Sequence, residues 1–256
     1  MTQFAHATRP CRSGRVEGQG AIRRCPANFD PNATLATDCS WAVQLTACIG
    51  NVVVRLSEAA KREIDVNDGE DTVEDEIRPA QEVARRSLAL FAVVGAALGV
   101  PRDEVISWLR TEGLWGALTS HEVAYLEQTN APRKAHINFG WQSERLIVLL
   151  WALGKIQELP DSATQCDTGV FKSILPPFAR TSAQAFIAQA TLIDEDSLWK
   201  QADYYLEDHW KARDAQLHER SMPPGIDIEI VQERHHAINW ITGYDGLPWD
   251  EVTTDT

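Results

Sequence analysis

The amphipathic pattern that begins at Pro79 constrains the fold of this 256-residue chain more than any other feature. From there almost to the C-terminus, apolar residues recur every three to four positions, which is the period of one face of an α-helix. No series of alternating apolar and polar residues indicates a β-sheet. We therefore predict an all-α fold, a single helical domain of about seven to nine helices. The predicted helices cover residues 79–98, a segment after Pro101, a segment after Thr119, and residues 135–157, 182–193, 197–218 and 228–243.

Several helix ends carry local signals. Pro79 suits the first turn of a helix, because a proline there loses no helical hydrogen bond, and Gly99 suits the position just after the last turn. Thr119 and Glu122 have the spacing of a capping box, in which the hydroxyl and the carboxylate each accept from the other residue's backbone N–H.

The chain before residue 78 lacks the helical pattern. Residues 1–40 are rich in Arg, Gly, Pro, Asn and Thr without any period, so we expect a loosely ordered leader. Residues 41–77 contain enough apolar residues for a helix, followed by an acidic stretch with seven acids among residues 65–76. We interpret that stretch as a solvated linker or, alternatively, as a charged binding strip. The predicted division is therefore 1–40, 41–77 and a helical domain over 78–256.

Net charge separates the classes of partner. The formal charge of −13 combines a basic N-terminal quarter with residues 65–256, which hold 16 basic and 32 acidic side chains. Such a surface does not suit a phosphate backbone, so we expect no nucleic acid and favour a basic protein partner. The longest uncharged apolar run, residues 88–100, is shorter than the roughly 20 residues that span a bilayer, so no membrane association is expected. The five cysteines form no regular framework, which is typical of a cytoplasmic protein.

Familiar cofactor and catalytic motifs are missing. There is no glycine-rich phosphate loop and no G-x-S-x-G turn, and we expect no cofactor. Tyr125 stands where a zinc protease that begins like His121-Glu122 would carry its second histidine. Glu233 and His236 supply one E-x-x-H pair, whereas a di-metal bundle needs two such pairs and two further glutamates. We expect no metal; Glu233, His236 and His209 are the residues that would hold one.

Three predicted helices carry ionisable residues on the same face as tryptophans, and we call each such row a stripe. The stripes are Trp141, Glu144, Arg145, Val148, Trp151 and Ala152; Trp199, Asp203, Leu206, Trp210 and either Arg213 or Asp214; and Glu233, His236, Ala237 and Trp240, with Arg234 and Ile241 on the flank. We predict that each stripe faces the core, because tryptophan buries a large apolar area.

A buried charge is unfavourable unless it is paired. We therefore infer that the three helices converge and that their acids, Glu144, Asp203 and Glu233, meet Arg213, Arg234 and one of the histidines. The cluster is either a structural network that fixes helix register or a ligand or catalytic pocket, unless the three helices do not meet.

Ordered motifs along the helical region carry a family resemblance. They are Arg85-Arg-Ser-Leu-Ala-Leu90, Trp108-Leu109 with Gly113-Leu-Trp115, Trp141-x-x-Glu144 with Leu150-Trp-Ala-Leu153, His209-Trp-x-x-Arg213-Asp214, Glu233-Arg-His with Asn239-Trp240, and the ending Trp249-Asp-x-Val-x-Thr-Asp-Thr256. Over residues 78–256 the chain resembles a bacterial domain-of-unknown-function family, number 4272. The resemblance implies a bacterial, helix-rich domain and supplies no activity. It marks as signatures Glu144, Asp203, Trp210, Arg213, Glu233, Arg234, Asn239, Trp240, Trp249, Asp250 and Asp255.

Two classes of function fit the sequence. The first, which we favour, is a cytosolic binding protein whose acidic surface meets a basic protein. The second is a small-molecule enzyme in which Glu144 or Glu233 is the general base and Arg213 or Arg234 holds an anionic group. The catalytic candidates are Glu144, Asp203, His209, Arg213, Glu233 and Arg234, and the ligand-binding candidates are Trp141, Trp151, Trp210, Asn239 and Trp240.

Overall fold

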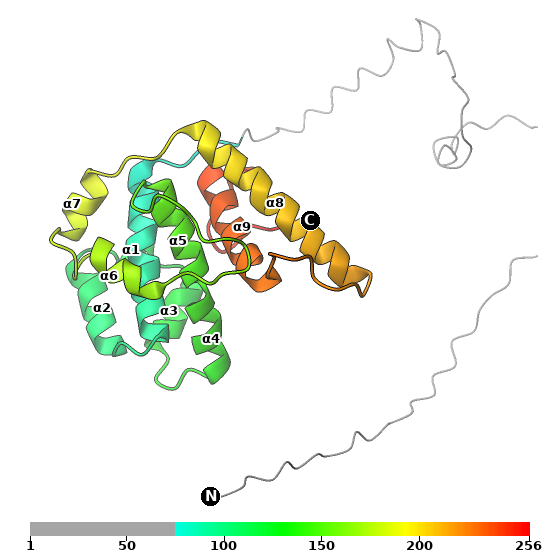
Figure 1. Ribbon diagram of the computed structural model, residues 1–256. Coiled ribbons are helices and arrows are strands. Elements are labelled where there is room, and N and C mark those ends of the chain that lie inside the picture. The colour runs from blue at the N-terminus through cyan, green and yellow to red at the C-terminus, as the bar shows by residue number, and fades with distance from the viewer. Residues whose placement is uncertain (1–74) are drawn as a thin grey trace, which may run out of the picture. The chain divides into compact units, whose positions relative to one another are not determined.

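The computed structural model describes residues 75–256, and in that range its regular structure is entirely helical (Figure 1). The all-α prediction is confirmed for this part of the chain. The leader predicted for residues 1–40 and nearly all of the segment predicted for residues 41–77 lie outside the described residues. Within 75–256, every helix is too short or too polar to cross a bilayer.

The longer helices supply most of the packing surface. They are α1 (Ala80–Ala97), α2 (Arg102–Thr111), α3 (Ser120–Glu127), α4 (Arg133–Trp141), α5 (Ser143–Ala152), α8 (Glu195–Leu217) and α9 (Ile228–Thr242). The shorter elements are η2 (Trp115–Ala117), η3 (Thr168–Val170), α6 (Phe171–Ile174), α7 (Ala183–Ala188) and η4 (Tyr244–Gly246).

Helices α1 and α9 organise the core. Helix α1 packs against α2, α4, α5 and α7, while α9 lies between α5 and α8 (Figure 1). Because α9 is covered on both sides, all of residues 234–242 are buried. The apolar core joins these helices through side chains that include Leu88, Val93, Leu146, Leu149 and Ile238. Any polar side chain of α9 between residues 234 and 242 must therefore find its partners inside the protein.

The predicted helix ends are found where the local signals place them. The N–H of Glu122 donates to Thr119 Oγ1 at 3.3 Å, and the N–H of Thr119 donates to Glu122 Oε2 at 2.9 Å, which completes the capping box. Pro79 precedes α1 directly.

Two predicted helices are shorter than expected. The helix predicted over residues 135–157 is divided into α4 and α5 at Gln142, where ψ is −3°. Gly140 weakens the helix just before the break, and Gly154 has a φ of +65°, which no helix accommodates, two residues after α5 ends. The helix predicted over residues 182–193 covers only α7.

The prediction that the stripe on residues 197–218 faces the core is wrong. Trp210 is 54% exposed and Leu206 is 44% exposed. Helix α8 contacts α9 with a different row of residues. Each residue of that row directly precedes a residue of the stripe in sequence, so the two rows lie about 100° apart around the helix axis. That inner row is Leu198, Ala202, Tyr205, His209 and Ala212. Its alanines allow α8 to lie close to α9, and the wider tryptophan row is left outside.

The segment before α1 is fixed to the C-terminal end of α9. The backbone N–H of Arg78 donates to Ile241 O at 2.9 Å, and Arg78 Nε donates to Trp240 O at 2.8 Å, so two terminal carbonyls of α9 are satisfied. Gly243 ends α9 with a φ of +80° and lies so close to Glu76 that an added Cβ would overlap the Glu76 carbonyl oxygen. Gly243 is thus required both by its backbone conformation and by the approach of Glu76.

We predict that Gly243→Ala destabilises the domain more than Gly113→Ala does. Both glycines follow a helix with positive φ, which costs an L-residue about 1–2 kcal/mol. Only at Gly243 does the new methyl meet backbone, which should add about 1–3 kcal/mol to the loss. Urea unfolding of the two variants measures the difference, and equal losses would contradict the close contact with Glu76.

Candidate functional site

Arg234 of α9 and Glu144 of α5 form an ion pair inside the core. Arg234 Nε and Nη2 donate to Glu144 Oε2 at 3.0 and 2.8 Å, and the two side chains are 0% and 2% exposed. Two of the acids and bases that we expected to meet therefore do so. A charge this deeply buried is stable only if the rest of its hydrogen-bonding capacity is also used.

The loop after α5 satisfies the remaining groups. Arg234 Nη1 donates to Pro160 O at 2.6 Å and to Asp161 O at 3.0 Å, and Nη2 donates to Thr164 O at 2.8 Å. All five N–H groups of the guanidinium are thereby used. Glu144 Oε1 accepts the backbone N–H of Cys166 at 2.8 Å. The pair therefore fixes this loop to α5 and α9, and Arg234 has no donor left for a ligand.

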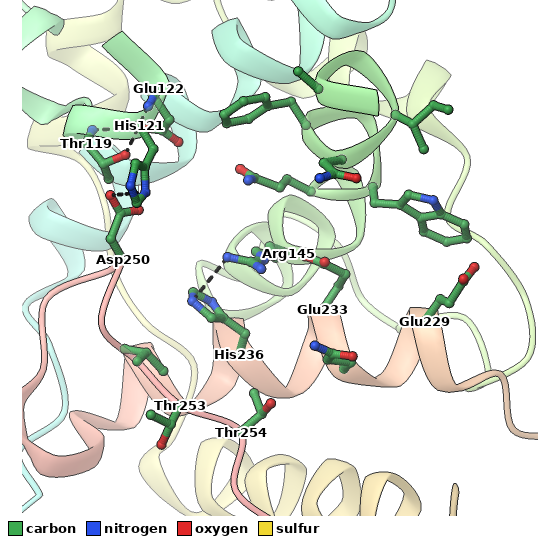
Figure 2. Close-up of a pocket in the computed structure, with 18 residues that line it drawn as sticks. Thr119, His121, Glu122, Arg145, Glu229, Glu233, His236, Asp250, Thr253 and Thr254 are labelled. Atoms are coloured by element: carbon green, nitrogen blue, oxygen red, sulfur yellow. Dashed lines mark hydrogen bonds and ion pairs between the residues drawn. The ribbon is translucent and has the colours of Figure 1, made fainter. Parts of the chain in front are cut away.

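A cleft of about 830 Å³ lies between the start of α3, α4, α9 and the C-terminal segment 250–254; we call it the α4–α9 cleft (Figure 2). Its titratable lining residues are His121, Glu122, Arg145, Glu229, Glu233, His236 and Asp250. Trp141, Phe139 and Ile137 of α4 add apolar surface. The cleft brings together Trp141 and Glu233 of the predicted site residues, together with His236.

Arg145 lies at the base of the cleft. Because it follows Glu144 by one residue, it projects about 100° away around α5 and reaches the cleft instead of the core pair. Its Nε donates to Glu233 Oε2, and its Nη1 lies 3.1 Å from His236 Nε2. The charge of Arg145 is therefore neutralised by Glu233, and the two side chains cross-link α5 and α9.

His236 stays neutral beside this ion pair. Burial first, and then the positive charge of Arg145, lowers its pKa to about 2. Its Nε2 also lies 3.0 Å from Trp249 O. Nε2 can donate to the Trp249 carbonyl when it carries the ring proton, or accept from the Arg145 guanidinium when it does not. It therefore makes one of these two hydrogen bonds at a time. His236 Nδ1 is buried without a hydrogen-bond partner among the described residues.

The remaining charged residues that line the cleft are acidic. Glu122 is buried and paired with Arg86, whose Nη1 donates to it at 2.9 Å. His121 Nδ1 lies 3.2 Å from Asp250 Oδ2, but the His121 side chain is 79% exposed. Glu229 is exposed and makes no ion pair within the part of the chain described. Glu229 and Asp250 are thus the carboxylates that no arginine or lysine of the described residues neutralises.

The other predicted residues of α5 and α9 are placed around the cleft or in the core. Asn239 Nδ2 donates to Thr253 O at 3.1 Å and so holds the C-terminal wall of the cleft. Trp240 is buried with its ring edge-to-face against Trp249 at 5.1 Å. Trp151 packs partly buried against the core and does not line the cleft.

His209 lies between α8 and α9, apart from the cleft. Its Nδ1 is 3.1 Å from Nδ1 of His235, and both side chains are buried. Burial lowers the pKa of both rings, that of His235 to about 4. The contact is therefore a hydrogen bond between two neutral imidazoles. His209 is thus not brought to Glu233 and His236, and residues 75–256 contain no group of three or more His, Cys, Asp or Glu arranged to hold a metal.

The remaining candidates are Asp203, Trp210 and Arg213, which lie exposed on the outer face of α8 and line no part of the cleft. The single network that we expected is thus divided into the core pair, the cleft residues and the exposed stripe of α8.

Several residues of the cleft were not among the predicted site residues, among them His121, Glu122, Glu229 and Arg145, and neither was Arg86, the partner of Glu122. Arg145 appeared in a stripe, and its position next to Glu144 is the signal that the two side chains face different directions. Arg86 has no local signal, because its partner Glu122 is 36 residues away in sequence.

We predict that Arg234→Lys lowers the free energy of unfolding by about 2–4 kcal/mol, since lysine offers three donors without a planar fork and leaves buried acceptors unpaired. Arg133→Lys, at an exposed position on α4, is the matched control and should change it by less than about 0.5 kcal/mol. Urea unfolding measures both. A loss for Arg234→Lys as small as that of the control would show that the core pair does not stabilise the fold.

We also predict that the protein loses stability as the pH falls from about 6.5 towards 4. The pKa values of His209, His235 and His236 are lowered on folding from 6.5, so below that pH the unfolded chain binds protons that the folded chain does not. Each histidine contributes at most about 1.4 kcal/mol per pH unit. His236→Gln, which retains a donor for Trp249 O, should flatten the dependence, whereas the exposed variant His218→Gln should not. An unchanged slope in His236→Gln would contradict the neutral buried ring.

Comparison with known proteins assigns the chain to a family. It matches a family described as "Domain of unknown function (DUF4272)" over residues 58–252, which begins 20 residues before the segment that the motifs indicated. No curated protein and no solved structure matches it. The match covers well over half of the sequence, and the chain therefore belongs to the DUF4272 family.

Proposed function

We propose that this protein is a cytosolic bacterial binding protein, and that its α4–α9 cleft receives a positively charged group from a basic partner protein. The observation that carries the proposal is the charge of the cleft. Glu233 and Glu122 are neutralised by Arg145 and Arg86, whereas Glu229 and Asp250 line the cleft without an arginine or lysine partner among the described residues. A lysine or arginine side chain of a partner would supply the missing charge.

The size of the cleft supports a ligand larger than an ion. Its volume of about 830 Å³ lies within the usual range of about 300–1,000 Å³ for ligand pockets. Phe139, Ile137 and Trp141 form an apolar wall on which the methylene stem of a long basic side chain would pack. Glu229 or Asp250, which lie on opposite sides of the cleft in Figure 2, would then contact the charged head.

The charge of the whole domain supports the same class of partner. Residues 65–256 carry twice as many acidic as basic side chains. A field of one sign accelerates the encounter with an oppositely charged protein and weakens as salt is added.

A small-molecule enzyme is the second candidate, because Glu233 lies in the cleft beside Arg145 and the neutral His236. Glu144 is a poor base for this role, since both of its oxygens accept buried hydrogen bonds. Arg234 is fully occupied and Arg213 is on α8, so an anionic substrate group would have to compete with Glu233 for Arg145. This competition is why we place binding first.

A titration with hexalysine peptide tests the binding proposal. Calorimetry on the full chain at low salt should show binding that weakens as salt is raised, because the contact is electrostatic. The double variant Glu229→Gln/Asp250→Asn should bind about 5- to 30-fold more weakly, since two exposed charge contacts of about 0.5–1 kcal/mol each are lost.

The control removes the same charge elsewhere. Glu104→Gln/Glu158→Gln changes two exposed acids outside the cleft and should bind hexalysine nearly as well as the unmodified protein. If the control weakens binding as much as the cleft variant does, the peptide responds only to overall charge. The proposal then fails, as it does if hexalysine does not bind at all.

A further inference from the structure

The outer face of α8 carries a row of exposed apolar side chains that nothing in the described part of the chain covers. Trp199, Leu206, Trp210 and Leu217 are 37%, 44%, 54% and 79% exposed. Large apolar residues grouped on one face commonly mark an interaction surface. Helix α8 lies at the outside of the helical assembly with α9 on its inner side, so the row is open to a partner (Figure 1).

The row has the spacing of a helix-pairing seam. Together with two charged residues it comprises Trp199, Asp203, Leu206, Trp210, Arg213 and Leu217, whose separations alternate between four and three residues. This is the a/d pattern with which one helix packs along another. The seam extends over most of α8, a 23-residue helix about 34 Å long.

The seam is complementary to itself when a second copy runs antiparallel. We place the two-fold axis at the level of residue 208 along the helix. Trp199 of one copy then faces Leu217 of the other, and Leu206 faces Trp210. Asp203 then faces Arg213. The same three pairs recur on the other side of the axis, so the seam has four apolar layers and two layers of opposite charge.

Asp203 and Arg213 are free to make these contacts. Both are exposed, and neither forms an ion pair or a side-chain hydrogen bond within the described residues. Their neighbours on the helix are already paired: Lys211 with Glu207 at 2.8 Å, and Asp214 with Arg220. In a parallel arrangement Asp203 would face Asp203 and Arg213 would face Arg213, which like charges disfavour.

We propose that the outer face of α8 is the self-association surface of this protein, and that two copies pair through antiparallel α8 helices. An isologous contact of this kind requires a surface that complements itself about a two-fold axis. The seam meets that condition, because its apolar residues face apolar residues and its charged residues face residues of opposite charge. A shallow hollow of about 430 Å³ bounded by Trp210, Arg213, Leu217 and Thr256 receives the N-terminal half of the partner's α8.

Sedimentation velocity on the full chain over a range of concentrations tests the proposal. The unmodified protein should shift from monomer to dimer as its concentration rises, because a single helix pair buries less surface than a permanent interface does. Leu206→Glu places two carboxylates beside the axis and should abolish the dimer. Since Leu206 is exposed, the variant should retain the unmodified far-UV circular dichroism spectrum and unfolding midpoint.

Charge exchange identifies the partner as a second copy. Asp203→Arg and Arg213→Asp should each raise the dimer dissociation constant about tenfold or more, because each sets like charges opposite one another at two places. The double variant Asp203→Arg/Arg213→Asp should recover the original dissociation constant. A mixture of the two single variants should form a heterodimer, in which every charge again faces its opposite. Lys134→Asp on α4, a charge reversal at an exposed site away from α8, is the matched control and should leave the dissociation constant unchanged.

Three results would overturn the proposal. The first is an unmodified protein that stays monomeric at every concentration reached. The second is a dimer that Leu206→Glu leaves intact, which would place the interface elsewhere. The third is a double variant as weak as either single variant, which would mean that Asp203 and Arg213 do not face each other and that the stripe of α8 serves a different protein.

Discussion

The arrangement of the domain depends on the buried contact between Arg234 and Glu144. It joins α5 to α9 and, through three backbone carbonyls and one backbone N–H, also fixes the loop that follows α5. A buried ion pair adds little net stability compared with apolar packing. Replacing one of its two residues is nevertheless strongly destabilising, because the other charge is then buried without a partner. The pair fixes the register between α5 and α9. It thereby determines where the adjacent residues, Arg145 and Glu233, enter the cleft.

Local sequence signals were sufficient for the fold class and for several helix ends. The capping box at Thr119, Pro79 before α1 and Gly99 after it each act within a few residues, so their effect can be predicted without knowledge of the tertiary structure. The break at Gln142 was not predictable in this way, because apolar periodicity continues through it. Loop 160–166 has no periodicity, and its course is set by long-range contacts with Arg234, Glu144 and Asp208.

The candidate site could be predicted only in part, because the sequence does not show which face of a helix points to the core. Helical spacing identifies which residues share a face but not which face meets the core. Helix α8 shows the difficulty: its tryptophan row looks more apolar than its inner row of alanine, tyrosine and histidine, yet the inner row is narrower and fits against α9. The partners of Arg145 and Arg86 lie 88 and 36 residues away, distances over which one sequence carries no pairing signal.

The C-terminal segment has a consequence for work with this protein. Asn239 anchors Thr253, segment 250–254 forms one wall of the cleft, and Thr256 borders the hollow on α8. A short stretch of chain thereby touches both surfaces to which we assign an interaction. A substitution among residues 251–256 would disturb both surfaces at once, and a loss of binding in such a variant could not be assigned to one of them. Variants meant to separate the two interactions should therefore be placed on α9, on α8 or at Asp250 and should leave residues 251–256 unchanged.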